Sequence, residues 1–201
     1  MRLTEIFNTD SDETWIGKLQ SIVAKHGLSI FNGNNAYVIA SEDRNYVYRF
    51  WVKDPGYEAW LDLAMQHQDN VHMPKILGKI RTVNAHFAKL PKDMKLKMVK
   101  IEKLKPATEE WADVANLVNH VIHERDADKW TPSTLIDAMV NATKELTGDQ
   151  DEADKLEEFL NKNMEFMKVV CDLVNEGYND FTDQNVMMRG LDPVITDPVA
   201  S

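Results

Sequence analysis

The sequence predicts an α+β fold in two lobes, a β-rich lobe over residues 1–104 and a helical lobe over residues 105–201. Two observations predict it. Short runs of aromatic and β-branched residues, separated by polar turns, fill most of the first half. Apolar residues in the second half instead recur at the 3.6-residue spacing of helices. A chain of 201 residues is long enough for one compact domain or two small lobes.

In the first half, the spacing of Trp15 and Leu19 predicts an N-terminal helix over residues 12–26, which Gly27 would end. Strands are expected over residues 28–31, 36–40, 46–52, 76–82 and 96–104. Asp54-Pro55 predicts the start of a helix that extends to about residue 67, because Asp is a good N-cap and Pro suits the first helical position. Residues 86–95 follow no clear pattern.

The second half predicts three amphipathic helices. The first runs from Thr108 onward, and Thr131-Pro132 opens the second. The third is expected as one long helix over residues 152–176, with Gly177 ending it. The single cysteine, Cys171, falls on the apolar face of that helix and is expected in the core.

Composition excludes several classes of partner. The net charge is −10, which opposes direct binding to nucleic acid because that needs a basic surface. No stretch approaches the roughly 20 apolar residues that a membrane-spanning helix needs, so no membrane association is expected. One cysteine cannot form an intrachain disulfide, which fits a reducing cytoplasm.

The most informative segment lies near the end of the chain. Asp180 is followed five residues later by Asn185, then by an apolar run, a turn, and a second apolar run that ends at Asp197. This pattern is typical of kinase-type phosphotransferases, in which the first Asp accepts the hydroxyl proton and the Asn and last Asp hold Mg²⁺. The expected cofactors are therefore ATP and Mg²⁺. Asp183 either adds a ligand or stabilises the loop through an Asx-type bond.

The order of elements and this closing motif resemble the protein-kinase-like fold, and within it the early serine/threonine protein kinases of T-seven-type podophages. The resemblance is firm over residues 178–199, where Asp197-Pro198 stands in place of Asp-Phe-Gly, and loose over residues 28–104. It implies a two-lobed fold with a small β-rich N-lobe and an abbreviated helical C-lobe. It also implies that the nucleotide binds between the lobes.

The resemblance also implies roles for individual residues. Asp180 is similar to the catalytic base, and Asn185 and Asp197 are similar to the metal ligands. The implied nucleotide-binding residues are Gly33, Arg49, Glu58 and Glu102. Arg49 takes the place of the strand lysine, with Glu58 as its helix partner. Gly33 stands where a glycine-rich loop would cover the phosphates. Glu102 lies in the hinge segment, whose backbone would contact adenine.

Two functions follow as expectations. The first is a phage-type serine/threonine protein kinase that transfers the γ-phosphoryl of ATP to host proteins in the bacterial cytoplasm. The second is a catalytically weak kinase-like protein that binds and inhibits a host protein. Asp180, Asn185 and Asp197 favour the first, and Arg49 in place of lysine favours the second. A small-molecule phosphotransferase would use the same chemistry, but the chain lacks room for a lobe that binds such a substrate.

Overall fold

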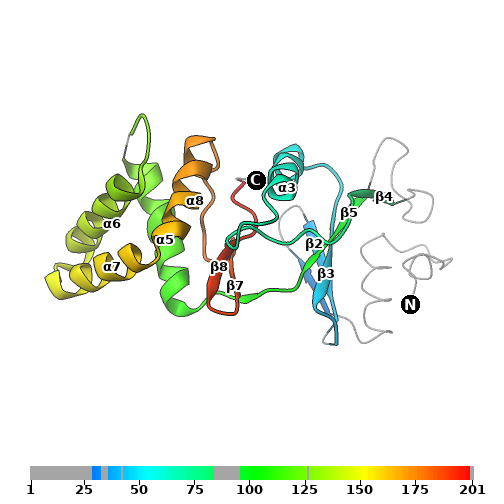
Figure 1. The fold of residues 1–201 in the computed structure, drawn as a ribbon, viewed down its shortest axis with the longest axis horizontal. Coiled ribbons are helices and arrows are strands. Elements are labelled where there is room, and N and C mark those ends of the chain that lie inside the picture. Colours follow the sequence, from blue (N-terminus) through cyan, green and yellow to red (C-terminus); the bar gives the residue numbers. More distant parts are fainter. Residues whose placement is uncertain (1–28, 33–35, 42, 84–95, 126, 200–201) are drawn as a thin grey trace. The chain divides into compact units, whose positions relative to one another are not determined.

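The computed structural model describes residues 29–32, 36–41, 43–83, 96–125 and 127–199. In these residues the chain is α+β, with two antiparallel sheets and five helices (Figure 1). They divide into two compact units: a sheet unit with residues up to 68 and 75–103, and a helical unit with residues 69–74 and 104–199. The expected helix over residues 12–26 and the unassigned segment 86–95 lie outside the described residues.

The sheet unit is built on one five-stranded antiparallel sheet in the order β1-β2-β3-β5-β4. Its strands are β1 (Ser29–Asn32), β2 (Ala36–Ala40), β3 (Tyr46–Trp51), β4 (Arg81–Val83) and β5 (Leu96–Glu102). The predicted strands at 28–31, 36–40, 46–52 and 96–104 are confirmed within one or two residues.

The predicted strand over residues 76–82 is wrong for most of its length, since β4 covers only its end. Ile76 forms an isolated bridge with Ile101. Its N–H is hydrogen-bonded at 2.9 Å to the side-chain oxygen of Gln68, so this backbone is held by a side chain and does not continue a strand ladder.

Helix α3 (Pro55–Gln66) begins where the sequence predicts it. A carboxylate oxygen of Asp54 accepts the Tyr57 N–H at 2.9 Å, which satisfies one of the unpaired donors at the helix start. The helix buries Tyr57, Trp60, Leu61 and Ala64. Tyr57 meets Trp51 of β3 edge to face, with ring centroids 5.3 Å apart, so α3 packs on the sheet through aromatic contact.

The helical unit contains α5 (Glu109–Glu124), α6 (Pro132–Thr147), α7 (Gln150–Lys162) and α8 (Met164–Asn175). The predicted starts are confirmed, with Thr108 and Thr131 as side-chain caps of α5 and α6. The core is formed by fully buried side chains from several helices, including Leu135, Met139, Leu160, Met167 and Val170. Cys171 lies in this core, as predicted.

The prediction of one long helix over residues 152–176 is wrong, because the chain breaks at Asn163 between α7 and α8. The Asn163 side chain donates to the Phe159 carbonyl at 2.8 Å, and its backbone N–H bonds back to Leu160. Asparagine competes in this way for backbone partners that a continuous helix would use. The apolar stripe read from the sequence therefore belongs to two helices, α7 and α8.

The helical unit also contains a three-stranded sheet in the order β6 (Lys105–Pro106), β7 (Val186–Arg189) and β8 (Asp192–Ile195). Strands β7 and β8 form the predicted hairpin, with Gly190 in its turn at a φ of 67°.

The segment 69–74 lies against this hairpin, although the sequence assigned it to the first lobe. The Arg189 guanidinium donates to the Val71 and Met73 carbonyls at 2.5 and 2.8 Å. The Ile195 N–H donates to the His72 carbonyl at 3.0 Å. Within the described ranges, no helix combines the length and the apolar character that crossing a membrane requires.

Candidate functional site

The loop that carries Asp180 starts where α8 ends. Gly177 has a φ of 96°, a left-handed conformation that favours glycine, and it ends the helix as the sequence predicts. The Tyr178 N–H reaches back to the Leu173 carbonyl at 3.0 Å. The chain thus leaves the helix in a fixed direction toward Asp180.

Helix α5 holds this loop through two asparagines. The Phe181 N–H donates to the Asn119 side-chain oxygen at 3.3 Å, and the Asp183 N–H donates to that of Asn116 at 3.2 Å. The two asparagines are three residues apart and therefore share one face of α5. Phe181 is 1% exposed and anchors the loop in the core. Sequence reasoning missed this support, although two asparagines at helical spacing on an otherwise apolar stretch were a usable signal.

Asp180 and Asn185 meet directly. The Asn185 side-chain N–H₂ group donates to both the Asp180 carbonyl, at 3.0 Å, and the Asp180 Oδ2 atom, at 2.9 Å. The Asn185 backbone N–H donates to the Thr182 carbonyl at 2.9 Å. These bonds fix the orientation of the amide and leave its carbonyl oxygen outside the bonds to Asp180. The structure therefore brings together the first two predicted site residues.

Hydrogen bonds on both sides of Asp197 tie its backbone to the same loop. The Thr196 N–H and hydroxyl donate to the Asn185 carbonyl at 2.8 and 3.1 Å. The Pro198 carbonyl accepts the N–H groups of Asn179 and Asp180, each at 3.2 Å. Asp197 lies between these two attachments and is partly buried. All three residues of the predicted motif are thus connected within the helical unit.

The chemistry of this arrangement is that of an oxygen-rich site. Two carboxylates and one amide oxygen are the ligand types that a hard divalent cation such as Mg²⁺ prefers. Among the residues that the structure describes, no three His, Cys, Asp or Glu side chains gather as a metal site. A cation held here would therefore need the amide oxygen of Asn185 in addition to the Asp197 carboxylate, and oxygen donors of these types fit Mg²⁺.

In the sheet unit, Arg49 lies on β3, opposite Val99 of β5. Its guanidinium carbon lies 3.6 Å from the ring centroid of Tyr57, which is 1% exposed. This cation–π contact holds the guanidinium over the buried ring. Arg49 is therefore placed on the sheet face that α3 covers.

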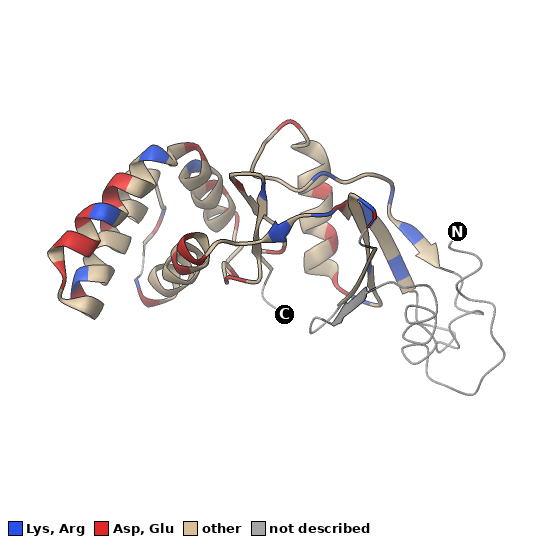
Figure 2. Ribbon diagram, turned by 90° about the horizontal axis from the view of Figure 1, so that it is seen from below, with Lys and Arg blue, Asp and Glu red and all other residues tan. Residues whose placement is uncertain are grey.

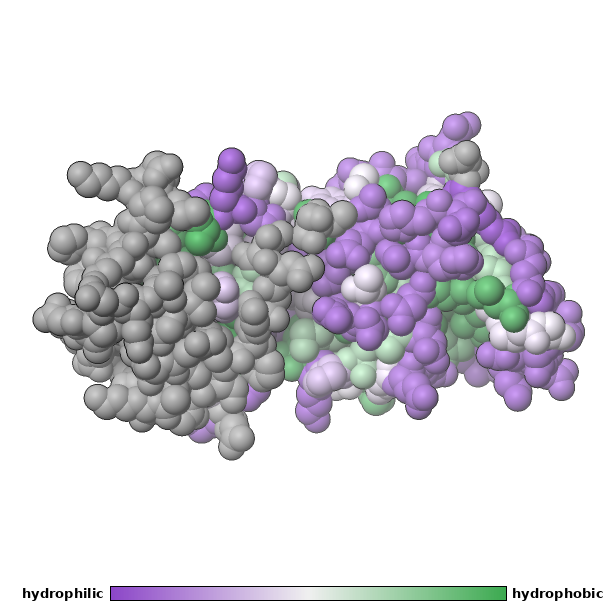
Figure 3. Space-filling model, turned by 180° about the vertical axis from the view of Figure 1, so that it is seen from behind, coloured by the Kyte–Doolittle hydropathy of each residue, from purple (hydrophilic) through white to green (hydrophobic). Residues whose placement is uncertain are grey.

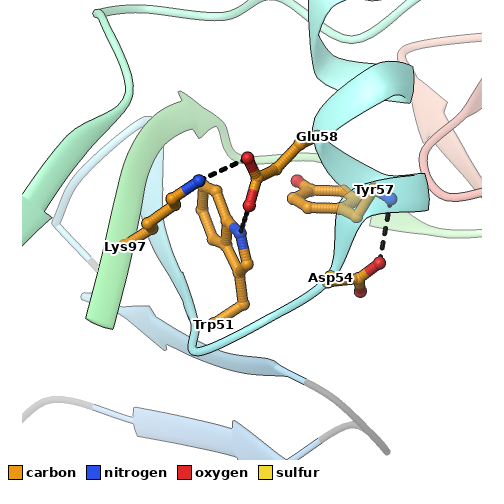
Figure 4. A network of polar contacts seen from close by, with 5 residues as sticks. All are labelled: Trp51, Asp54, Tyr57, Glu58 and Lys97. Atoms are coloured by element: carbon orange, nitrogen blue, oxygen red, sulfur yellow. Dashed lines mark hydrogen bonds and ion pairs between the residues drawn. The ribbon is translucent and has the colours of Figure 1, made fainter. Parts of the chain in front are cut away.

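Glu58 does not pair with Arg49, which corrects the expectation from the resemblance. Its carboxylate accepts the Trp51 indole N–H at 3.1 Å and forms an ion pair with Lys97 of β5 (Figure 4). Trp51 and Lys97 lie directly opposite each other in the β3–β5 ladder. Sequence reasoning missed Lys97, because only the strand register brings it to Glu58.

The environment of Glu58 has opposing effects on its pKa. Partial burial, the largest single effect, raises it, whereas the hydrogen bonds from Lys97 and Trp51 and the charge of Lys97 lower it. Together these interactions hold the pKa of Glu58 below its ordinary value.

Glu102 ends β5 and is used inside the sheet unit. Its carboxylate accepts the Lys75 N–H at 2.6 Å, and its own N–H donates to the Lys75 carbonyl at 3.0 Å. The next N–H, that of Lys103, donates to the Asn45 carbonyl at 2.9 Å. Neither N–H group is therefore available to adenine, which corrects this part of the expected hinge.

The last predicted residue, Gly33, lies outside the described residues.

Comparison of the chain with protein-family models gives no match, and comparison with curated proteins gives none either.

Proposed function

We propose that this chain is an ATP-dependent serine/threonine protein kinase of the phage type, which transfers the γ-phosphoryl of ATP to proteins of its bacterial host. The observation that carries the proposal is the hydrogen bond between Asn185 and Asp180, together with the bonds that attach both sides of Asp197 to the same loop. Phosphoryl transfer of this class needs one carboxylate near the acceptor hydroxyl and a separate amide and carboxylate for the metal.

Each residue then has a separate task. The Asp180 Oδ2 atom takes the bond from Asn185, so its Oδ1 atom can accept the hydroxyl proton of a serine or threonine. The same bond orients the Asn185 amide, whose oxygen would hold Mg²⁺ together with Asp197. When bound, the metal ion would neutralise the charge that develops on the transferred phosphoryl group.

The sheet unit supports the proposal through Arg49. Protein kinases carry the phosphate-binding cation on the third strand and a glutamate on the helix that follows. Arg49 is on β3, and α3 follows directly with Glu58 in its first turn. A guanidinium is always charged and can hold phosphate oxygens through two parallel hydrogen bonds.

One observation favours the second candidate, a kinase-like protein that binds and inhibits a host protein with little or no catalysis. In active protein kinases the strand cation and the helix glutamate must pair. Here the carboxylate of Glu58 is bound by Lys97 and Trp51. A chain in which Glu58 pairs with Lys97, and not with the strand cation Arg49, can keep the fold while losing catalytic turnover.

The test is incubation of the purified full chain with Mg²⁺, γ-labelled ATP and bacterial lysate. We expect labelled host proteins, and we expect Asp180→Asn to lower labelling by about 10²-fold or more, because a positioned general base contributes about 10²–10⁴-fold. The matched control is Asp192→Asn, which removes an exposed carboxylate at the start of β8 and should keep most of the activity. Retention of more than about a tenth of wild-type labelling by Asp180→Asn would contradict the base role.

A further inference from the structure

Helices α5, α6 and α7 of the helical unit enclose a groove of about 480 Å³. Its apolar lining residues are Val114, Leu117, Leu146, Leu156 and Phe159. Figure 3 shows hydrophobic residues recessed between hydrophilic ones in the helical unit. The volume lies within the range of pockets that bind ligands, about 300–1,000 Å³.

Two polar side chains of the lining are already hydrogen-bonded within the chain. Thr143 and Thr147 belong to the groove wall, but their hydroxyls donate to the carbonyls one turn earlier in α6, at 3.1 and 3.0 Å. Leu146, between them in the same turn, is 67% exposed. Leu146 therefore extends the apolar lining of the groove to the surface, where apolar side chains of a partner can reach it.

The rim of the groove is acidic. Glu110 and Asp113 of α5 and Glu152 of α7 line it, against the single cation Lys155. Within the described part of the chain, none of these three carboxylates forms an ion pair or a side-chain hydrogen bond.

Elsewhere in the same unit, three acids have a basic partner. Glu145, Glu158 and Glu165 pair with Arg125, Lys162 and Lys168 respectively. Figure 2 shows basic residues interspersed among the acidic ones on the helices. Among the described residues, the three rim acids have no such partner and outnumber the one cation of the lining, so the rim can attract a positive charge from outside the chain.

We propose that this groove binds a basic amphipathic segment of another protein. Bulky apolar side chains of that segment would cover Leu146, Leu156 and Phe159, and its lysines or arginines would meet Glu110, Asp113 and Glu152 at the rim. A second copy of this chain is a poor occupant because its net charge is −10. The groove would recruit a protein partner and needs no phosphoryl transfer, so it goes beyond the function proposed above.

The test uses a labelled helical peptide with leucine at i, i+3, i+4 and i+7 and lysine elsewhere, titrated with the full chain and followed by fluorescence anisotropy. We expect micromolar binding that weakens with salt, and no binding of a peptide with glutamate in place of every lysine. Equal binding of the two peptides, or no binding of either, would overturn the proposal. Nucleotide is absent, so a negative result leaves the proposed phosphotransferase activity standing.

Two matched pairs of variants localise the binding. Asp113→Lys should weaken it about tenfold, whereas Asp137→Lys, an exposed site on α6 outside the groove, makes the same charge change and should leave it unaltered. Leu146→Ser should also weaken binding, while Lys155→Glu should strengthen it. Equal effects of Asp113→Lys and Asp137→Lys would show charge attraction without a groove. Leucine-dependent self-association in sedimentation, in place of peptide binding, would assign the groove to a second copy; either result refutes the proposal.

Discussion

At the scale of single residues, Glu58 is the side chain whose partners matter most for the choice between the two candidate functions. It receives an ion pair from Lys97 and a hydrogen bond from Trp51, and its side chain is 28% exposed. The two bonds to this partly buried carboxylate stabilise the sheet unit. They also occupy the carboxylate that would pair with Arg49 in the kinase arrangement.

The first prediction concerns the pH dependence of this pair. The pKa of folded Glu58 lies below its ordinary value of 4.5, so the pair stabilises the protein at neutral pH and is lost as pH falls through the folded-state pKa. Glu58→Gln should therefore lower the free energy of unfolding by about 1 kcal/mol at pH 7. The difference from wild type should vanish under acid conditions that protonate the wild-type carboxyl. Urea titrations at several pH values measure it, and a difference that grows toward low pH would contradict the assignment.

The second prediction concerns Cys171, which is 2% exposed. Burial, with a smaller effect from Asp172, raises the pKa of this thiol to about 12 from an ordinary value of 9.0. A thiol-specific reagent at pH 8 should therefore leave the native protein unmodified and label the cysteine after denaturation. The raised pKa also means that stability is lost as pH rises above about 9. Rapid labelling of the native protein would show that Cys171 is not in the core.

At the scale of elements, the sequence predicted correctly the helix starts, which depend on interactions between residues close together in the chain. Asp54, Thr108 and Thr131 marked helix starts because an N-cap acts on an N–H only a few residues away. The break at Asn163 was missed, since apolar spacing continues across it and only the competing side-chain bond ends the helix. The strand over residues 76–82 failed because Gln68 holds the backbone from outside the segment.

The candidate site also contains residues that the sequence could predict and contacts that it could not. Asp180, Asn185 and Asp197 could be predicted because one short stretch of chain carries all three. The pairing of Glu58 with Lys97 could not, since 39 residues separate them and the β3–β5 register decides the contact. The support of the loop by Asn116 and Asn119 likewise depends on how α5 packs.

The third prediction concerns the hairpin that separates Asn185 from Asp197. Gly190 has a φ of 67°, where an L side chain is strained, so Gly190→Ala should lower stability by about 1–2 kcal/mol. Gly78→Ala is the control, because its Cβ would only reach ordinary contact with the Lys100 Cβ at 3.9 Å and should change stability by about 0.5 kcal/mol or less. Thermal unfolding of both variants measures the difference, and equal losses would show that the turn conformation is not the cause.

At the scale of the whole molecule, the two units carry different parts of the proposed chemistry. The helical unit holds Asp180, Asn185 and Asp197, and the sheet unit holds Arg49 and Glu58. The groove between α5, α6 and α7 belongs to the helical unit alone. The groove residues are different from Asp180, Asn185 and Asp197, so substitutions can test partner binding through the groove and phosphoryl transfer separately.

Asp197→Ala is the variant that separates the two candidate functions. Its carboxylate is one of two charges proposed near the metal, and Mg²⁺ requires near-octahedral oxygen ligands. In an active kinase, the change should abolish both labelling of host proteins and the rise in melting temperature that Mg²⁺-ATP gives the wild type, because a ligand that binds only the folded state stabilises it by mass action.

In a kinase-like inhibitor, the same change should leave capture of host proteins intact. The experiment therefore pairs labelling with pull-down from host lysate, for wild type and Asp197→Ala side by side, with Asp192→Ala as the control. Asp192 is an exposed aspartate of the same hairpin, at the opposite end of β8. Undetectable labelling by wild type, with a pull-down unchanged by Asp197→Ala, would reject the enzyme and leave the binding protein. Labelling that is lost in Asp197→Ala and kept in Asp192→Ala would establish the enzyme.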